Sequence, residues 1–322
     1  MRSRRLAVPL ALIATVALPL SACSDTGAGS GGDGPIPEVY AALYPLEFVA
    51  AEVGGDHVSV SPITPAGTDP HDLELSTNTV ARLDGSMVVY LSDFQAALDD
   101  ALDVASPDVT LDVAEPARVT SWGLEAAHGE DEPAHSEEEA THEGGHDHEH
   151  SGATDPHFWL DPLRLADVAD AVADEYAELD PDNADDYATN AEHLRSELED
   201  LDADLATGLE NCRTHTIVAA HEAYGYLADR YGLEQVGISG LDPESEPSPA
   251  RLAEIREVVE REGVTTIFAE QLVNPAVAES FASDLGIDVE MLNPLETEPD
   301  SGDYLEAMRQ NLETLSTALQ CS

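Results

Sequence analysis

Three histidines that lie far apart in the chain each have neighbours typical of a metal-ligand position. His71 and His157 each follow an Asp-Pro pair, and His221 directly follows an apolar run at 216–220. Proline restricts its own φ and the conformation of the residue before it, so each pair fixes the backbone beside its histidine. Imidazole is a favoured zinc ligand, and three imidazoles with one carboxylate complete a tetrahedral site. The sequence therefore predicts a protein that binds Zn²⁺.

A histidine-rich segment lies between the first two of these positions. Residues 128–150 hold six of the chain's 12 histidines among nine Asp or Glu residues. The six are His128, His135, His142, His146, His148 and His150. The segment has no apolar periodicity and cannot bury a core, so we expect a disordered loop. Such a loop can bind additional zinc only weakly, because each capture must order it.

The N-terminus predicts export and lipid anchoring. Residues 1–22 combine an arginine-rich start with an apolar stretch at 6–20, which is too short to span a bilayer comfortably. The stretch ends in Leu-Ser-Ala-Cys at Cys23, which resembles a bacterial lipobox; an ordinary cleaved signal with an incidental cysteine is the alternative. Residues 23–36 are rich in glycine and predict a flexible tether. We expect an extracytoplasmic lipoprotein that only its lipid holds to the membrane.

The charge and the basic composition exclude several classes of function. The formal net charge is −53, and every basic residue is arginine. A chain without lysine has neither a Walker-A phosphate loop nor a lysine Schiff base. The electrostatic field of a chain this acidic repels nucleic acid and attracts cations, so we expect no nucleic-acid partner. Adaptation to a saline habitat would also explain the charge.

Two cysteines, Cys212 and Cys321, remain after lipidation. Outside the cytosol two remaining cysteines usually pair, so the sequence predicts a disulfide that ties the C-terminus to the last domain. Two free buried thiols are the alternative.

Strand-like and helix-like runs alternate along the chain, as in βα units. The predicted strands are residues 38–43, 57–60, 87–91 and 110–113 in the first half, and 214–220, 235–238, 264–269 and 287–292 in the second. The clearest helices between the later strands are residues 249–262 and 275–285. The pattern predicts an α/β protein with two lobes.

A long helix is expected at the join between the lobes. Asp180-Pro181 is a helix-start signal, with a capping carboxylate and proline at the first helical position. Apolar residues then recur at spacings of three and four: Ala184, Tyr187, Ala191, Leu194, Leu198, Leu201 and Leu205. They predict a helix of about 28 residues, roughly 40 Å long. We expect this linking helix at 181–210, between an N-terminal lobe at 37–180 and a C-terminal lobe at 211–322; a surface helix of one domain is the alternative.

The ends of the predicted strands are where the ligands should meet. In α/β sheets, ligands collect at the carboxyl ends of strands, and His221 directly follows one. His71 comes after strand 57–60, and the last strand leads into Asn293-Pro294-Leu295-Glu296. Two groups from each lobe could therefore converge in the cleft between them.

Three longer motifs carry a family resemblance. They are Asp-Pro-His-Asp-Leu-Glu at 69–74, Asp-Pro-His-Phe-Trp-Leu-Asp-Pro at 155–162 and His-Glu-Ala-Tyr-Gly-Tyr-Leu at 221–227, which Arg-Tyr-Gly-Leu follows at 230–233. The mature chain resembles the metal-specific solute-binding proteins of bacterial ABC importers, the zinc and manganese type known as cluster A-I. The resemblance implies two βα-sandwich lobes joined by one long rigid helix, with the metal site between the lobes.

The resemblance also bears on the fourth ligand. Many relatives have aspartate where this chain has Asn293, whereas zinc binders with Asn-Pro-Leu-Glu use the glutamate, so Glu296 is the transferred candidate. A water or an open position is the alternative. Glu222 and Glu270 are expected to support the site rather than bind metal. Manganese relatives typically have glutamate in place of the third histidine, so His221 favours zinc.

The resulting expectation is a monomeric, non-enzymatic zinc receptor that delivers Zn²⁺ to an ABC-type permease and its ATPase. A manganese or iron receptor of the same importer class is one alternative. A surface-anchored zinc hydrolase would need a general base, for which Glu74 or Glu222 could serve. The His-Glu-x-x-His run at 142–146 lies in the segment expected to be a disordered loop, so no His-Glu-x-x-His helix is expected. A metal-buffering or adhesive lipoprotein is a third possibility.

Overall fold

The computed structural model describes residues 37–119 and 154–322. The predicted export signal, Cys23 and the six histidines of segment 128–150 lie outside the described residues. Within the described ranges, no helix has both the length and the apolar character that a membrane span requires.

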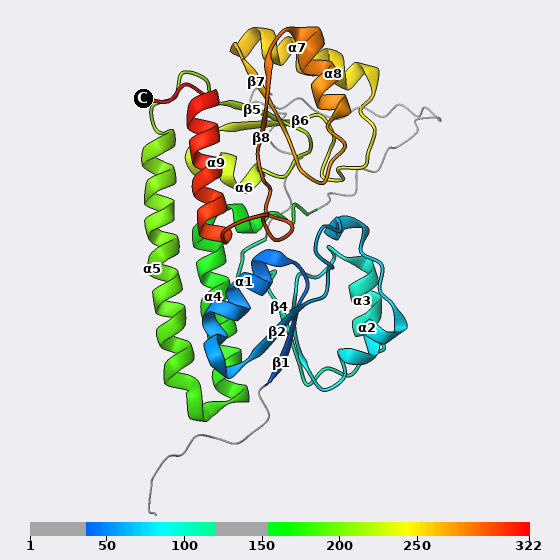
Figure 1. Ribbon diagram of the computed structural model, residues 1–322, viewed down its shortest axis with the longest axis vertical. Coiled ribbons are helices and arrows are strands. Elements are labelled where there is room, and N and C mark those ends of the chain that lie inside the picture. Colours follow the sequence, from blue (N-terminus) through cyan, green and yellow to red (C-terminus); the bar gives the residue numbers. More distant parts are fainter. Residues whose placement is uncertain (1–36, 120–153) are drawn as a thin grey trace, which may run out of the picture. The chain divides into compact units, whose positions relative to one another are not determined.

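The first lobe is the blue to cyan part of Figure 1. It is built on a four-stranded parallel sheet with strand order β2-β1-β3-β4. The strands are β1 Glu38–Ala41, β2 Ser59–Pro62, β3 Met87–Tyr90 and β4 Val109–Asp112. The helices that accompany them are α1 Tyr44–Gly54, α2 Thr77–Arg82 and α3 Ala96–Leu102. The central strands, β1 and β3, are mostly buried and apolar, as expected for a parallel sheet covered on both faces.

The second lobe repeats this arrangement with strand order β6-β5-β7-β8, again all parallel. Its strands are β5 Thr216–Ala219, β6 Glu234–Gly237, β7 Thr266–Ala269 and β8 Asp288–Met291. Its helices are α6 Gly225–Tyr231, α7 Pro249–Glu262, α8 Ala276–Leu285 and α9 Tyr304–Ala318. The predicted class, two α/β lobes with parallel sheets, is confirmed.

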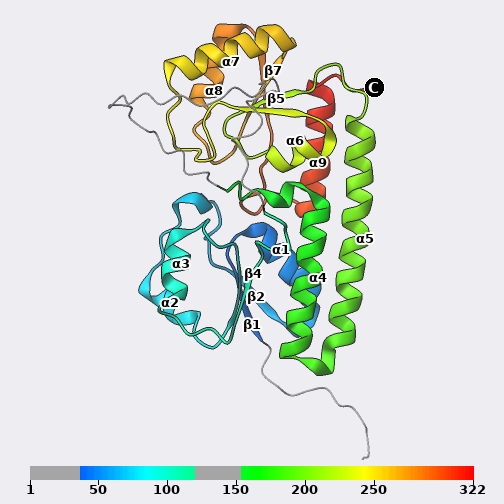
Figure 2. The same cartoon turned by 180° about the vertical axis from the view of Figure 1, so that it is seen from behind.

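The linking helix is α5, Ala184–Leu209, which forms a hairpin with α4, Pro162–Leu179 (Figure 2). The predicted apolar stripe from Tyr187 to Leu205 is buried and continues to Leu209. Helix α5 contacts α1 and α4 along one part and α6 and α9 along another, so it joins both lobes.

The chain becomes helical at Pro181, as predicted, but α5 itself begins only at Ala184. Pro181–Asn183 forms a separate 3-10 turn, η4, and α5 has 26 residues. The Asp180 carboxylate does not cap a backbone N–H; it accepts hydrogen bonds from Asn183 Nδ2 and Tyr187 Oη at 2.6 and 2.9 Å. The second predicted strand also starts late, because Gly55–His57 forms a 3-10 turn before Ser59.

Cys212 and Cys321 form a disulfide with an S–S distance of 1.94 Å. The bond joins the segment before β5 to the residues after α9. Nearby, the backbone N–H groups of Arg213 and Thr214 donate to the carbonyl of Leu319, at 3.0 and 3.2 Å. The C-terminus is therefore tied to the first strand of the second lobe.

Candidate metal centre

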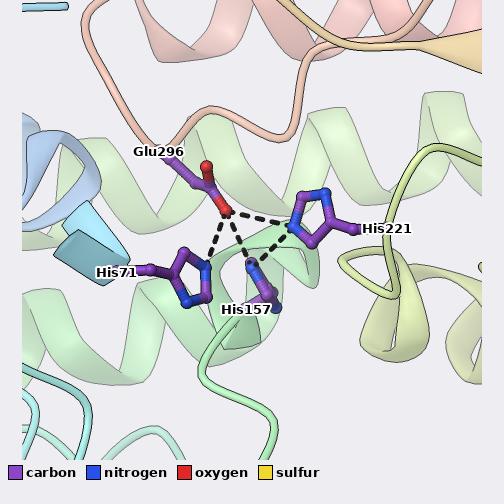
Figure 3. Close-up of side chains that lie close together, drawn as sticks. All are labelled: His71, His157, His221 and Glu296. Atoms are coloured by element: carbon purple, nitrogen blue, oxygen red, sulfur yellow. Dashed lines mark hydrogen bonds and ion pairs between the residues drawn. The ribbon is translucent and has the colours of Figure 1, made fainter. Parts of the chain in front are cut away.

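The three histidines and Glu296 converge at one point (Figure 3). Each offers one ligand atom, and these atoms all lie within 4.8 Å of one another. Glu296 Oε1 lies 3.3 Å from His71 Nε2, 2.9 Å from His157 Nε2 and 3.3 Å from His221 Nε2. The Nε2 atoms of His157 and His221 are 3.4 Å apart. Ligand atoms held at about 2.0–2.1 Å from a tetrahedral zinc are about 3.3 Å from one another, which matches this spacing.

The four side chains come from both lobes. His71 lies in the 3-10 turn η2, Pro70–Asp72, and His157 immediately precedes the turn η3, Phe158–Leu160. His221 follows β5 and Glu296 follows β8, at the carboxyl ends of their strands. His157, His221 and Glu296 are buried, whereas 15% of the His71 side chain is exposed. An ion at this point would be screened from water on all sides except that of His71.

Both Asp-Pro-His motifs form the same local turn. Asp69 Oδ1 accepts from the backbone N–H of His71 at 2.8 Å, and Asp155 Oδ1 accepts from that of His157 at 2.9 Å. Proline restricts the backbone of these turns, as expected. The aspartate side chain contributes as well, by binding the backbone two residues ahead.

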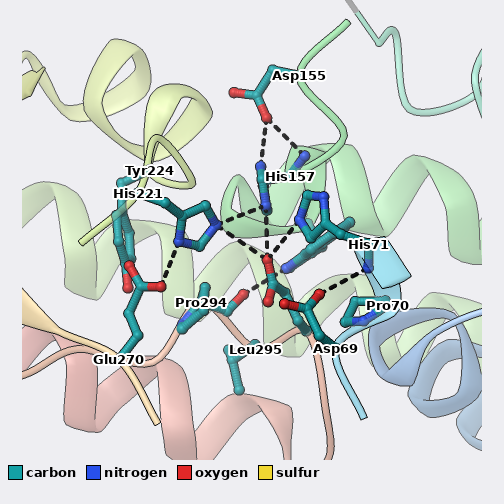
Figure 4. A network of polar contacts seen from close by, with 12 residues as sticks. Asp69, Pro70, His71, Asp155, His157, His221, Tyr224, Glu270, Pro294 and Leu295 are labelled. Atoms are coloured by element: carbon teal, nitrogen blue, oxygen red, sulfur yellow. Dashed lines mark hydrogen bonds and ion pairs between the residues drawn. The ribbon is translucent and has the colours of Figure 1, made fainter. Parts of the chain in front are cut away.

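Buried carboxylates orient two of the three rings (Figure 4). His157 Nδ1 donates to Asp155 at 2.7 Å, and His221 Nδ1 donates to Glu270, which directly follows β7. A hydrogen bond at Nδ1 fixes the tautomer and turns Nε2 toward the centre. Glu270 thus supports the site, as expected. The ring contact of Asp155 was missed, although its position two residues before a histidine was the available signal.

The carboxylates also set the proton affinity of the metal-free cluster. Burial alone would lower the pKa of both His157 and His221. Hydrogen bonds to Asp155 and Glu296 outweigh burial and raise the pKa of His157, and those to Glu270 and Glu296 raise the pKa of His221 to about 10. Burial would raise the pKa of Glu296, but its hydrogen bonds to the histidines hold it well below the usual value. The cluster therefore binds protons where zinc would bind.

A strained turn aims Glu296 at the centre. Leu295 is buried and has a φ of 59°, in the left-handed region that non-glycine residues rarely adopt. The turn is held by Asn293 Oδ1, which accepts from Leu295 N–H at 2.8 Å, and by Trp159 Nε1, which donates to the carbonyl of Pro294 at 2.8 Å. The Asn293 side chain thus serves the turn, and Glu296 is the residue that reaches the three histidines.

Asn311 of α9 anchors the same loop, and the sequence offered no signal for it. Its Oδ1 accepts from the backbone N–H of Asn293 at 3.0 Å, and its Nδ2 donates to the carbonyl of Asn293 at 2.6 Å. Asn311 is buried, so these bonds satisfy groups that water does not reach.

Two other histidines and the two suggested general bases do not join this cluster. His193 is 72% exposed, and His57 pairs with Asp186 on the surface. Glu222 pairs with Arg251 at 3.2 Å, and Glu74 is exposed. Neither carboxylate suggested as a general base belongs to the group of converging ligand atoms.

The sequence is similar to zinc-binding and zinc-uptake proteins of other bacteria. The chain is 33% identical over 320 residues to the zinc-binding lipoprotein AdcA of Streptococcus pneumoniae, with 96% of this chain and 60% of that protein covered. The chain thus spans about 60% of the length of that relative. It is 31% identical over 319 residues to the high-affinity zinc uptake system protein ZnuA of Bacillus subtilis, with 96% and 97% covered.

Solved structures share the fold. The laminin-binding protein Lbp of Streptococcus pyogenes aligns with a TM-score of 0.71 at 33% identity, covering 88% of this chain and 99% of that one. The Zn(II)-bound ZnuA-like domain of Streptococcus pneumoniae AdcA aligns with a TM-score of 0.68 at 29% identity, covering 89% and 99%. Residues 39–318 match the family model described as zinc-uptake complex component A, periplasmic. The chain therefore belongs to the ZnuA family.

Proposed function

We propose that the protein is the extracytoplasmic receptor of a high-affinity zinc uptake system and carries one Zn²⁺ between its lobes. The observation that carries this proposal is the convergence of three imidazole nitrogens on one oxygen of Glu296, with ligands from both lobes. Three nitrogens and one oxygen at this spacing suit a tetrahedral zinc ion. We propose His71, His157, His221 and Glu296 as the four ligands.

The donor set also argues for zinc over manganese or iron. Carboxylate and water oxygens suit manganese, whereas imidazole suits zinc. His221 contributes an imidazole, and both His157 and His221 have a carboxylate at Nδ1 that strengthens Nε2 as a ligand.

The delivery step follows from the family. A zinc-uptake component of this kind needs a membrane partner, and we propose an ABC-type permease with its ATPase. A lipid on Cys23 would keep the receptor at the membrane, in agreement with the name of the lipoprotein AdcA. We propose that the receptor acts as a monomer, because the four ligands belong to a single chain.

Metal competition tests the proposal. The purified protein should bind one zinc ion tightly in competition with a chelator, and excess manganese should displace it poorly. Single alanine variants of His71, His157 and His221 should each weaken binding. His193→Ala is the matched control, because His193 is exposed and outside the cluster. Equal retention of manganese and zinc would rule out the zinc assignment.

We further propose that the histidines of segment 128–150 bind additional zinc weakly. Deletion of residues 129–149 should leave the tight site intact and remove the weaker binding. Titration calorimetry on the intact and deleted proteins measures both. Loss of the tight site on deletion would mean that the segment supplies one of its ligands.

A further inference from the structure

The turn that carries His71 is held by two consecutive residues between β3 and α3. The Phe94 ring meets the His71 ring edge-on, with centroids 4.9 Å apart at 90°. Gln95 Nε2 donates to the carbonyl of Pro70 at 3.1 Å and to Thr64 Oγ1 at 3.0 Å. One contact thus fixes the ring of His71, and the other fixes the backbone directly before it.

The Gln95 contact continues into the sheet. Thr64 Oγ1 donates in turn to the carbonyl of Ala42, the residue that follows β1, at 2.6 Å. Thr64 and Gln95 are both buried. A hydrogen-bonded path therefore runs from the end of the central strand, through two side chains, to the residue that precedes His71.

The position of Gln95 shows that its amide serves this path rather than its own helix. Gln95 is the N-cap residue of α3, yet its side chain makes no capping hydrogen bond. Its Oε1 is buried and has no hydrogen-bond partner among the described residues. A buried oxygen without a hydrogen-bond partner carries a free-energy cost, and Gln95 keeps this conformation with its amide nitrogen on Pro70 and Thr64.

His71 depends on such a link more than the other two histidines do. Asp155 and Glu270 hold the rings of His157 and His221 at Nδ1. Across residues 37–119 and 154–322, no hydrogen bond to a carboxylate is found at Nδ1 of His71. Its placement therefore depends on the turn backbone, which Asp69 and Gln95 hold, and on Phe94.

We propose that Gln95 is a positioning residue of the zinc site that acts through His71. It keeps His71 Nε2 where it completes a four-coordinate centre, and so it contributes to the preference for zinc over ions that tolerate more open, oxygen-rich coordination. This inference rests on the proposed function, because it takes His71 as a zinc ligand.

A double-mutant cycle tests the inference in the whole exported chain, with zinc as the probe. Gln95→Leu should lower zinc affinity about 10- to 100-fold, the usual effect of losing a group that supports a ligand. In a His71→Ala background the same substitution should change affinity by less than about twofold, since the ligand through which it acts is gone. The cobalt(II) spectrum of Gln95→Leu should shift toward that of His71→Ala.

Two further variants separate positioning from folding. Asn190→Leu is the matched control, because Asn190 Nδ2 also donates to a backbone carbonyl, that of Val53, at 3.0 Å, but away from the cluster. It should leave zinc affinity and the cobalt spectrum unchanged. Thr64→Val, which removes the hydroxyl behind Gln95, should weaken zinc binding less than Gln95→Leu. Thermal unfolding of each variant confirms that it is folded.

The outcomes are distinct. If Gln95→Leu weakens zinc binding equally with and without His71, or does not weaken it at all, Gln95 is not a positioning residue for His71. If His71→Ala itself leaves zinc affinity unchanged, His71 is not a zinc ligand. That result would contradict the proposed ligand set, and with it the proposed function in its present form.

Discussion

At His221, two carboxylates outweigh burial in setting the charge of the ring. The pKa of His221 is raised to about 10 in the metal-free protein, because Nδ1 faces Glu270 and Nε2 faces Glu296. Zinc needs a bare Nε2, so binding at neutral pH must displace this proton. An unperturbed imidazole, with a pKa of 6.5, would release it before pH 7.

We therefore expect zinc affinity to keep rising above pH 7, by about tenfold per pH unit for each proton displaced. Titration calorimetry in buffers of different ionisation enthalpy counts those protons. An affinity that is constant between about pH 7 and 9 would contradict the raised pKa of His221.

The same shifts predict how the stability of the metal-free protein depends on pH. The raised pKa of His221 contributes stability that is complete below 6.5, its unfolded value, and is lost as pH rises through about 10. The lowered pKa of Glu296 contributes stability that is complete above 4.5 and is lost as pH falls through its folded value. Melting temperatures of the metal-free protein should therefore decline from about pH 6.5 toward 10, and a flat profile would contradict this coupling.

Replacing Glu270 by glutamine removes one negative charge and changes the side-chain volume little. Glu270→Gln should lower zinc affinity by about 10- to 100-fold, because the ring of His221 loses the anion that orients it and strengthens Nε2. It should also lower the pKa of His221 in the metal-free protein, which NMR titration measures. Glu222→Gln is the control, since Glu222 is the neighbour of His221 in sequence but pairs with Arg251 and does not belong to the converging ligand atoms. An unchanged affinity in Glu270→Gln would mean that Asp155 and the turn geometry suffice.

At the scale of elements, helix α6 approaches the site more closely than a side chain would allow. A Cβ at Gly225, its first residue, would lie 2.6 Å from Asp155 Oδ2. Asp155 cannot easily move, because it is buried and holds both the backbone and the ring of His157.

We expect Gly225→Ala to displace Asp155 and weaken zinc binding by about tenfold or more. Gly208→Ala in α5 is the matched control: its Cβ would lie 2.8 Å from Leu312 Cδ1, the flexible end of a side chain that is not among the converging residues. Chelator competition on both variants gives the comparison. Equal zinc affinities in the two variants would show that the approach of α6 to Asp155 is not critical.

Elements are also the scale at which the sequence was most informative. The stripe from Tyr187 to Leu205 predicted α5 because helical periodicity is a local property, and residues 249–262 were predicted to the residue. The three histidines could be identified because an Asp-Pro pair before a histidine and a histidine after a strand are local features of the sequence. The end of the last predicted strand led to residues 293–296, and the resemblance then selected Glu296 among them.

The supporting residues could not be found in this way. Gln95 contacts Pro70 across 25 positions, and Asn311 contacts Asn293 across 18. Neither pairing follows a helical or strand period. Such contacts depend on how separate elements pack, so only the folded chain shows which buried amide supports which turn.

At the scale of the whole molecule, the disulfide closes a loop across 109 positions that contains nearly all of the second lobe. In the chain-entropy view, a cross-link over about 100 residues stabilises by about 4–5 kcal/mol.

Replacing both Cys212 and Cys321 by serine should therefore lower the free energy of unfolding by up to that amount. Zinc affinity should not change, because neither residue belongs to the metal cluster. Denaturant unfolding with and without zinc measures both quantities, and a loss of affinity would show that the tail positions the ligands.

The convergence of three imidazole nitrogens on one oxygen of Glu296 has a consequence for the proposed delivery of zinc to a partner. A dication that enters as the proton of His221 leaves changes the net charge by less than its own +2. Against a formal charge of −53, the long-range electric field of the zinc-bound and zinc-free protein is then nearly the same. A partner that must distinguish the zinc-bound from the zinc-free protein could not do so by long-range electrostatic attraction. Such a partner would have to distinguish them at close contact, where the proposed ligands come from both lobes.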